Sequence, residues 1–314
     1  MISKLLIANR GEIAIRIMRS AANLDIRTVA INSKDDGDSL HVFRADEAVL
    51  LPGEGVAAYL DAKQIIELAR ENDCDAIHPG YGFLSENADF ALACNNAGLR
   101  FVGPSPETLA LFGDKAKARR FAASHDIPVL SGTLEPTSLE QAGKFLKDLD
   151  GGTMILKAVA GGGGRGVRIV EDTKQLASAF AQSSREANAA FANDDLYVEE
   201  FLSNARHIEV QVLGDEHGKL IHLGERDCSL QRRHQKVIEI APAPDLDSDL
   251  REKIIAAAVK LAAAADYSSA GTIEFLVDTS ANRFVFIEAN ARLQVEHTIS
   301  EEIYEVDLVE AQLR

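Results

Sequence analysis

Short apolar runs alternate with helical patterns in the first part of the chain. The apolar runs are KLLIA (4–8), IRTVAI (26–31) and AIHPG (76–80), and apolar positions recur with helical spacing in GEIAIRIMRSAANL (11–24) and AAYLDAKQIIELARE (57–71). Alternation of this kind predicts a mostly parallel sheet covered by helices. The first part of the chain is therefore expected to have an α/β fold.

Different patterns follow. DKAKARRFAASH (114–125) predicts a helix that connects to a smaller α/β unit, whereas polar and apolar residues alternate after 202 as in antiparallel strands. A helix is expected over 248–265, followed by a hairpin. We predict an α/β protein, α+β in part, with units at 1–112, 113–201 and 202–314. The chain stops inside the helical pattern VDLVEAQLR without a closing glycine, so we expect the natural domain to continue.

Composition limits the classes of partner. The 314 residues carry a formal net charge of −16, which argues against nucleic acid, because binders of nucleic acid usually have a basic excess. No uninterrupted apolar segment is long enough for a membrane span. Three cysteines without paired spacing favour a reducing compartment. The cytoplasm is the expected location, with the mitochondrial matrix or a plastid as alternatives after removal of a presequence.

The run KAVAGGGGRGVRIV (157–170) contains four consecutive glycines between two apolar stretches. Glycines let backbone amides approach a phosphate closely, and Lys157 and Arg165 would add positive charge beside them. The run does not match the usual P-loop pattern. A flexible loop is the alternative, but the flanking strand-like and basic residues favour a flap that covers phosphates.

The segment ERDCSLQRRHQKVIEIAPAP (225–244) is dense in charged and amide side chains. Most such runs are solvated loops or edges. The same density of donors also suits a ligand with several oxygens, such as a triphosphate or carbonate. The residues alone leave both interpretations open.

The segment FIEANARLQVEH (286–297) alternates strictly between apolar and polar residues. In an extended chain all five polar side chains would share one face, which could be a solvated surface or the wall of a site. If TSANR (279–283) is a five-residue hairpin loop, Asp278 pairs with Phe284 and Glu274 lies opposite Glu288. Like charges across a ladder need compensation, for which Mg²⁺ is a candidate and Arg292 in a surface network is the alternative.

Taken together, six segments in order resemble the biotin carboxylase component of biotin-dependent carboxylases, a branch of the ATP-grasp enzymes. They are IANRGEIAIRI, HPGYGFLSEN, GDKAKAR, KAVAGGGGRGVR, ERDCSLQRRHQKVIEIAPAP and EANARLQVEH, which together extend over nearly the whole chain. The resemblance implies a Rossmann-like pre-ATP-grasp N-terminal domain, followed by an ATP-grasp fold with a small glycine-rich lid subdomain.

The resemblance also implies roles for individual residues. Arg292, Glu296 and Lys236 match catalytic residues, with Glu296 as the base that deprotonates bicarbonate. Glu274, Glu288 and Asn290 match the ligands of Mg²⁺ (or Mn²⁺). The bicarbonate site is implied to use Lys236, Arg292, Gln294 and the backbone of Val295. The residues implied to bind the nucleotide are Lys115, Lys157, Gly163, Gly164, Glu199, Leu202, His207, Gln231 and His234.

The implied reaction uses ATP and bicarbonate to form carboxyphosphate and ADP, and then carboxylates biotin on a carrier protein. The implied partners are a biotin carboxyl carrier protein or domain and a carboxyltransferase component, and the sequence leaves homodimer formation and the final acceptor open. VIEIAPAP and EHTISEEI lean slightly towards the pyruvate carboxylase branch. Two alternatives are an ATP-grasp ligase of carbamoyl-phosphate synthetase type and a catalytically inert nucleotide-binding fragment.

Overall fold

The apolar runs near the N-terminus form a five-stranded parallel sheet with the strand order β3-β2-β1-β4-β5. Leu5, Leu6 and Ile7 of β1 are all fully buried, because helices cover both faces of the sheet. The predicted parallel sheet is therefore confirmed. The elements of this unit are β1 (Lys4–Ile7), α1 (Gly11–Asn23), β2 (Arg27–Asn32), η1 (Lys34–Asp36), α2 (Leu40–Arg44), β3 (Glu47–Leu50), α3 (Gly55–Ala58), α4 (Ala62–Glu71), β4 (Ala76–His78), α5 (Ala88–Asn96), β5 (Arg100–Phe101) and α6 (Pro106–Gly113).

This computed structural model describes residues 2–133, 135–149, 152–159, 166–191, 193–232 and 235–314. The prediction of a single helix over 57–71 is wrong, because this segment contains the end of α3 and a separate helix, α4. The side chain of Asp61 accepts a hydrogen bond from the Gln64 amide and so starts a new helix. Asn87 caps α5 in the same way, through the amide of Phe90.

A smaller unit contains a three-stranded antiparallel sheet with the order β7-β6-β8. Met154 pairs with Val170, so β6 and β7 form the strands predicted on both sides of the glycine run. Gly163 and Gly164 themselves lie outside the described residues. In the part of the chain that the structure describes, no helix is both long and apolar enough to cross a membrane. The elements of this unit are α8 (Leu139–Asp148), β6 (Thr153–Ala158), β7 (Arg168–Val170), α9 (Thr173–Phe191) and β8 (Leu196–Phe201). Helix α7 (Lys115–Ser124) precedes them and packs its Ala118 and Ala122 into the same core as Phe286 of β13.

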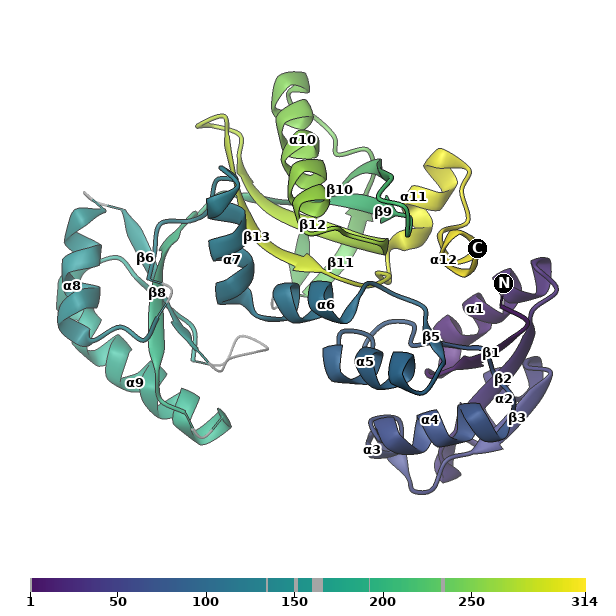
Figure 1. Cartoon of the computed structure of the whole chain (residues 1–314). Helices are drawn as coiled ribbons and strands as arrows, with labels where there is room; N and C mark the ends of the chain where they lie inside the picture. Colours follow the sequence, from purple (N-terminus) through teal and green to yellow (C-terminus); the bar gives the residue numbers. More distant parts are fainter. Residues whose placement is uncertain (1, 134, 150–151, 160–165, 192, 233–234) are drawn as a thin grey trace.

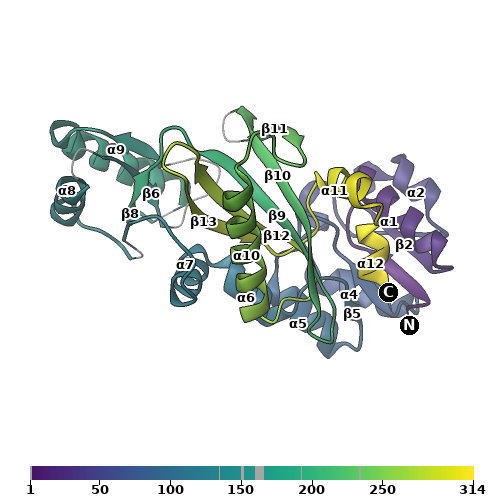
Figure 2. The ribbon, with the colours of Figure 1, turned by 90° about the horizontal axis from the view of Figure 1, so that it is seen from above.

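The remaining residues form a five-stranded antiparallel sheet with the order β11-β10-β9-β12-β13. Ile208 and Val210 of β9 and Phe275 of β12 pack in one core with Ile254 of α10, which lies along one face of the sheet (Figure 1). The alternate residues of these strands face the other side. Figure 2 shows this sheet between the smaller unit and the N-terminal unit. The elements are β9 (Arg206–Gly214), β10 (Leu220–Arg232), β11 (Gln235–Ile240), α10 (Ser248–Ala264), β12 (Ser269–Asp278), β13 (Arg283–Asn290), α11 (His297–Tyr304) and α12 (Leu308–Leu313).

The β12–β13 hairpin reaches the predicted glutamate pair by a different register. Asp278 pairs with Arg283, so the predicted pairing with Phe284 and the five-residue loop are wrong. A bulge between Glu274 and Phe275 then inserts one extra residue on β13 and shifts the register. Because of this shift Glu274 does lie opposite Glu288, as predicted.

The start of α7 provides a test of the fold. The Asp114 side chain accepts hydrogen bonds of 3.0 Å from the amides of Ala116 and Lys117, and the Lys117 amide is the main reason that the pKa of this carboxyl lies below its ordinary 3.8. We expect Asp114→Ala to lower the free energy of unfolding by about 1 kcal/mol at pH 7. A lowered pKa stabilises the fold fully above the unfolded-state value, so this difference should shrink below about pH 4.

Urea unfolding of the wild type and the variant at pH 7 and about pH 3.5 measures both effects. Asp114→Asn is the control, because an amide oxygen still caps the helix but does not titrate. An equal loss of stability at the two pH values in Asp114→Ala would contradict the capping role.

Candidate active site

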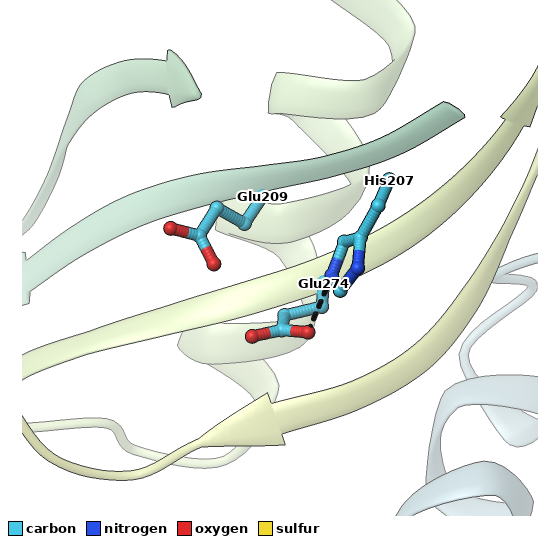
Figure 3. Close-up of side chains that lie close together, drawn as sticks. All are labelled: His207, Glu209 and Glu274. Atoms are coloured by element: carbon cyan, nitrogen blue, oxygen red, sulfur yellow. Dashed lines mark hydrogen bonds and ion pairs between the residues drawn. The ribbon is translucent and has the colours of Figure 1, made fainter. Parts of the chain in front are cut away.

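Four charged side chains form one row across neighbouring strands. Arg226 of β10 pairs with Glu209 of β9, which pairs with Glu274 of β12, which pairs with Glu288 of β13. All four lie on the face of the sheet that is turned away from α10. Glu209 and Glu274 are almost completely buried, and Figure 3 shows them on adjacent strands. Carboxylates side by side on a ladder repel each other, so this row needs cations.

Lys236 of β11 supplies the central positive charge. Its Nζ lies 2.6 Å from Glu209 Oε2, 2.6 Å from Glu296 Oε1 and 3.1 Å from Glu274 Oε1. Burial alone would lower the pKa of Lys236, but the surrounding carboxylates outweigh it and raise the pKa above its ordinary value. This ammonium therefore stays charged at neutral pH.

Arg226 holds the far side of Glu209. Its Nε donates to Glu209 Oε1 at 2.6 Å, and its Nη1 donates to Gln211 and to Ser300 at 2.8 Å each. Neither Arg226 nor Glu209 is accessible to solvent. Removing one partner of such a buried pair typically costs about 3–5 kcal/mol, so Arg226 fixes the Glu209 carboxylate firmly beside Lys236.

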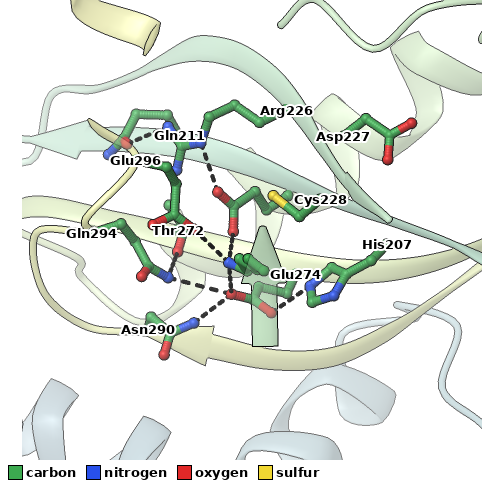
Figure 4. A network of polar contacts seen from close by, with 12 residues as sticks. His207, Gln211, Arg226, Asp227, Cys228, Thr272, Glu274, Asn290, Gln294 and Glu296 are labelled. Atoms are coloured by element: carbon green, nitrogen blue, oxygen red, sulfur yellow. Dashed lines mark hydrogen bonds and ion pairs between the residues drawn. The ribbon is translucent and has the colours of Figure 1, made fainter. Parts of the chain in front are cut away.

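Glu274 is the centre of a second set of contacts (Figure 4). It accepts hydrogen bonds from His207 Nε2 at 2.6 Å, Asn290 Nδ2 at 2.5 Å and Gln294 Nε2 at 3.3 Å. Burial acts to raise the pKa of Glu274, but His207 and Lys236 outweigh it and lower the pKa. In return Glu274 raises the pKa of His207 against the effect of burial.

The segment after β13 is a turn instead of a continued strand. The strand ends at Asn290, so the prediction of one extended chain to 297 is wrong beyond that residue. Gln294 and Glu296 are 5% and 7% exposed, whereas Val295 is 61% exposed. The alternation is thus reversed over 294–296. The interpretation as a solvated surface strand is also wrong, because Gln294 and Glu296 are buried and Glu288, Asn290 and Arg292 are only partly exposed.

Arg292 lies at the start of this turn. Its guanidinium donates to Gln294 Oε1 at 2.9 Å and to Asn290 Oδ1 at 3.1 Å, and its Nε lies 3.1 Å from Glu86 Oε2. The carboxylate that it contacts therefore comes from the N-terminal unit. Arg292 therefore connects the N-terminal unit to the unit with the five-stranded antiparallel sheet, directly beside the row of glutamates.

The residues predicted to bind a metal are adjacent. Glu288 Oε2 lies 2.7 Å from the Nζ of Lys115, and Lys115 lowers the pKa of Glu288 against the effect of burial. Glu274, Glu288 and Asn290 offer only oxygen ligands to an ion. Mg²⁺ prefers this kind of donor, combined with phosphate oxygens, so the residues fit a hard divalent cation. A second group shares Glu274 with this set: the potential ligand atoms of His207, Glu209 and Glu274 all lie within 4.8 Å of one another.

The predicted nucleotide residues of the smaller unit meet at β8. Glu199 is 4% exposed and pairs with both Lys157 and Arg119. Leu202 directly follows β8 and is half-buried. The structure thus brings Lys157 and Glu199 together, with Leu202 three residues further along the chain.

The remaining predicted contacts lie on β9 and β10. Gln231 Nε2 lies 2.9 Å from His207 Nδ1 and donates to the carbonyl of Cys228 at the same distance. The segment 225–244 contains the paired strands β10 and β11. Arg226 of β10 and Lys236 of β11 both contact the buried Glu209. Like Gly163 and Gly164, His234 lies outside the described residues.

Sequence reasoning missed Glu209, Arg226, Glu86 and Arg119. A signal for the first existed in RHIEVQVLG (206–214), where His207, Glu209 and Gln211 alternate with apolar residues. Combined with the alternation of Thr272 and Glu274 in β12, this pattern indicates one polar face shared by two strands. Glu86 and Arg119 lie in HPGYGFLSEN and GDKAKAR, two of the segments that carry the resemblance, but no local pattern shows what they contact, because Arg292 and Glu199 lie in distant segments.

Comparison with known proteins places the chain in a family. Residues 1–109 match the model for the biotin carboxylase N-terminal domain, and 114–314 match the model for the carbamoyl-phosphate synthase L chain ATP-binding domain. The chain is 54% identical to pyruvate carboxylase 1 of Caenorhabditis elegans and to human mitochondrial pyruvate carboxylase, over 99% of its own length. It spans 27% of the length of these relatives.

Solved structures agree in fold. Biotin carboxylase of Campylobacter jejuni superposes with a TM-score of 0.93 at 43% identity, covering all of this chain and 70% of that one. The biotin carboxylase domain of Hydrogenobacter thermophilus 2-oxoglutarate carboxylase, a dimer in complex with MgADP, ADP and bicarbonate, gives 0.92 at 44% identity, with 100% and 69% covered. The predicted fold class is thereby confirmed, and the chain belongs to the biotin carboxylase family of ATP-grasp proteins.

Proposed function

We propose that this chain carries the nucleotide and bicarbonate sites of an enzyme that carboxylates biotin on a carrier protein at the expense of ATP. Bicarbonate would attack the γ-phosphate to give carboxyphosphate and ADP, and carboxyphosphate would deliver CO₂ to N1′ of biotin. The observation that carries the proposal is the buried contact of Lys236 with Glu296, directly beside Arg292 and Gln294. This arrangement places a carboxylate base, Glu296, beside two fixed cations, Lys236 and Arg292, and the deprotonation of a bound anion requires both kinds of group.

In this mechanism the turn after β13 binds bicarbonate. Arg292 and Lys236 would attract the anion, and the backbone of the exposed Val295 would complete the site. Glu296 accepts the proton of bicarbonate, and Lys236, whose Nζ is 2.6 Å away, stabilises the carboxylate before that transfer. Gln294 holds Arg292 in place through its Oε1.

The nucleotide would lie between the smaller unit and the antiparallel sheet. Lys115 and Lys157 would bind phosphates, Gly163 and Gly164 would cover them, and Glu199 and Leu202 would hold adenine. His207, Gln231 and His234 complete the proposed contacts. When bound by Glu274, Glu288 and Asn290, Mg²⁺ or Mn²⁺ would neutralise charge on the phosphates. Phosphoryl transfer depends mainly on such positioning and charge neutralisation.

The proposed partners are a biotin carboxyl carrier protein or domain and a carboxyltransferase component. A homodimer is proposed by analogy with the Hydrogenobacter thermophilus domain, which is described as a dimer. The pyruvate carboxylases among the relatives favour a 2-oxo acid as the final acceptor. The cytoplasm, or the mitochondrial matrix as the name of the human relative suggests, remains the predicted location.

Two other functions give different results in one assay. An enzyme of the carbamoyl-phosphate synthetase type would need ammonia to complete its reaction, and the match of residues 1–109 to the biotin carboxylase N-terminal domain counts against it. An inert nucleotide-binding fragment would bind ATP without turnover.

We expect bicarbonate to drive ADP release, and free biotin, but not ammonia, to increase it further. Glu296→Gln should lower bicarbonate-dependent ADP release by about 10²- to 10⁴-fold, because the amide cannot accept the proton. The measurement is coupled detection of ADP with each substrate omitted in turn. Glu252→Gln is the matched control, because Glu252 is exposed on α10. Turnover that ignores bicarbonate contradicts the mechanism.

A second prediction concerns Arg292. Arg292→Lys keeps the charge but loses the planar fork that contacts Gln294 and Asn290, so the KM for bicarbonate should rise about 10- to 100-fold. The KM for ATP should stay within about twofold, since the proposed nucleotide contacts come from other residues. Initial rates over a bicarbonate titration test this, with exposed Arg70→Lys as the control. An equal rise in both KM values would show that Arg292 does not act on bicarbonate specifically.

A further inference from the structure

Helix α7 carries two cations one turn apart that contact carboxylates on two different sheets. Lys115 contacts Glu288 of β13, and Arg119 contacts Glu199 of β8. Residues at i and i+4 lie on the same face of a helix. Figure 1 shows α7 between β13 and the smaller sheet, so this single face reaches both sides of the proposed nucleotide site. The side chain of Lys115 is 65% exposed, whereas that of Arg119 is only 7% exposed.

Arg119 also contacts the segment that connects the two sheets. Its Nη2 donates to the carbonyl of Leu130 at 2.8 Å. On one side of Leu130, the carbonyl of Pro128 accepts a hydrogen bond from the amide of Phe286 in β13, and on the other the carbonyl of Ser131 accepts one from the amide of Glu200 in β8. The guanidinium therefore holds the place where the chain crosses from one unit to the other.

The two oxygens of Glu199 have different partners. Oε1 accepts from Arg119, and Oε2 contacts Lys157. If Lys157 turns towards a phosphate, Arg119 is the cation that remains on this buried carboxylate. Without Arg119, Glu199 would depend on Lys157 for its positive partner, because a buried carboxylate without a cation is strongly destabilised. Any phosphate would then have to compete with Glu199 for the same ammonium.

We propose that Arg119 is a positioning residue for the nucleotide. It keeps Glu199 neutralised and fixed to the Leu130 segment, so that Lys157 is available to a nucleotide phosphate. The proposal rests on the proposed function, because it assumes that Lys157 and Glu199 form part of the nucleotide site. A two-pronged donor is needed for this role, since one guanidinium contacts both Glu199 and the Leu130 carbonyl.

The test compares Arg119→Met and Arg119→Lys with the control Arg120→Met, whose side chain is exposed on the same helix. Calorimetry with MgADP should show about tenfold or weaker affinity for Arg119→Met, partial rescue in Arg119→Lys and wild-type affinity for the control. In kinetic assays the KM for ATP should rise while the KM for bicarbonate stays unchanged. A purely structural defect would not separate the two KM values.

A double-mutant cycle with Glu199→Gln provides the second measurement. The double variant should bind MgADP no more weakly than Glu199→Gln alone, because Arg119 acts through that carboxylate. Additive losses, or unchanged affinity in a folded Arg119→Met protein, overturn the proposal. If Arg119→Met does not fold, Arg119→Lys and the double variant decide by the same criteria. A wild-type chain that binds no MgADP would overturn the proposed function itself. This result differs from a failure of the Arg119 proposal alone, in which the wild type still binds MgADP.

Discussion

The row of three glutamates across β9, β12 and β13 is the constraint on which the rest of the site depends. Glu209, Glu274 and Glu288 are neighbours on adjacent strands, and the first two are buried. Such a row is unstable on its own, because each carboxylate loses hydration and repels the next. The fold is therefore possible only if cations from elsewhere reach this face of the sheet.

Those cations come from three different elements. Arg226 comes from β10, Lys236 from β11 and Lys115 from α7. Each ion pair that neutralises the row also fixes one element against the sheet. The turn after β13 is held in the same way, since Glu296 contacts Lys236. Charge neutralisation thus assembles the walls of the site as well as stabilising its floor.

The predictable features have local causes. Strands β1, β2 and β4 and helices α7 and α10 follow from patterns of apolar residues, and the Glu274–Glu288 pair follows from the hairpin, although a bulge corrected the register. The features that could not be predicted depend on which segments bury a strand face and on contacts between residues far apart in the sequence. Glu209 has the pattern of a solvated strand face until β11 and the turn cover it. Arg119 and Arg120 are identical neighbours in sequence, but Arg119 lies on the packed side of α7, where Glu199 and the Leu130 carbonyl are its partners, and Arg120 is exposed.

The lysines differ in how firmly the fold holds them, and this suggests a division of labour. Lys236 contacts three carboxylates and is 20% exposed, so moving it would leave several buried charges unpaired. Lys115 contacts Glu288 from a largely exposed position, and Lys157 shares Glu199 with Arg119. These two can exchange a carboxylate for a phosphate and remain paired throughout. In the proposed function, Lys236 would therefore act in place, whereas Lys115 and Lys157 would change partners on binding of a nucleotide.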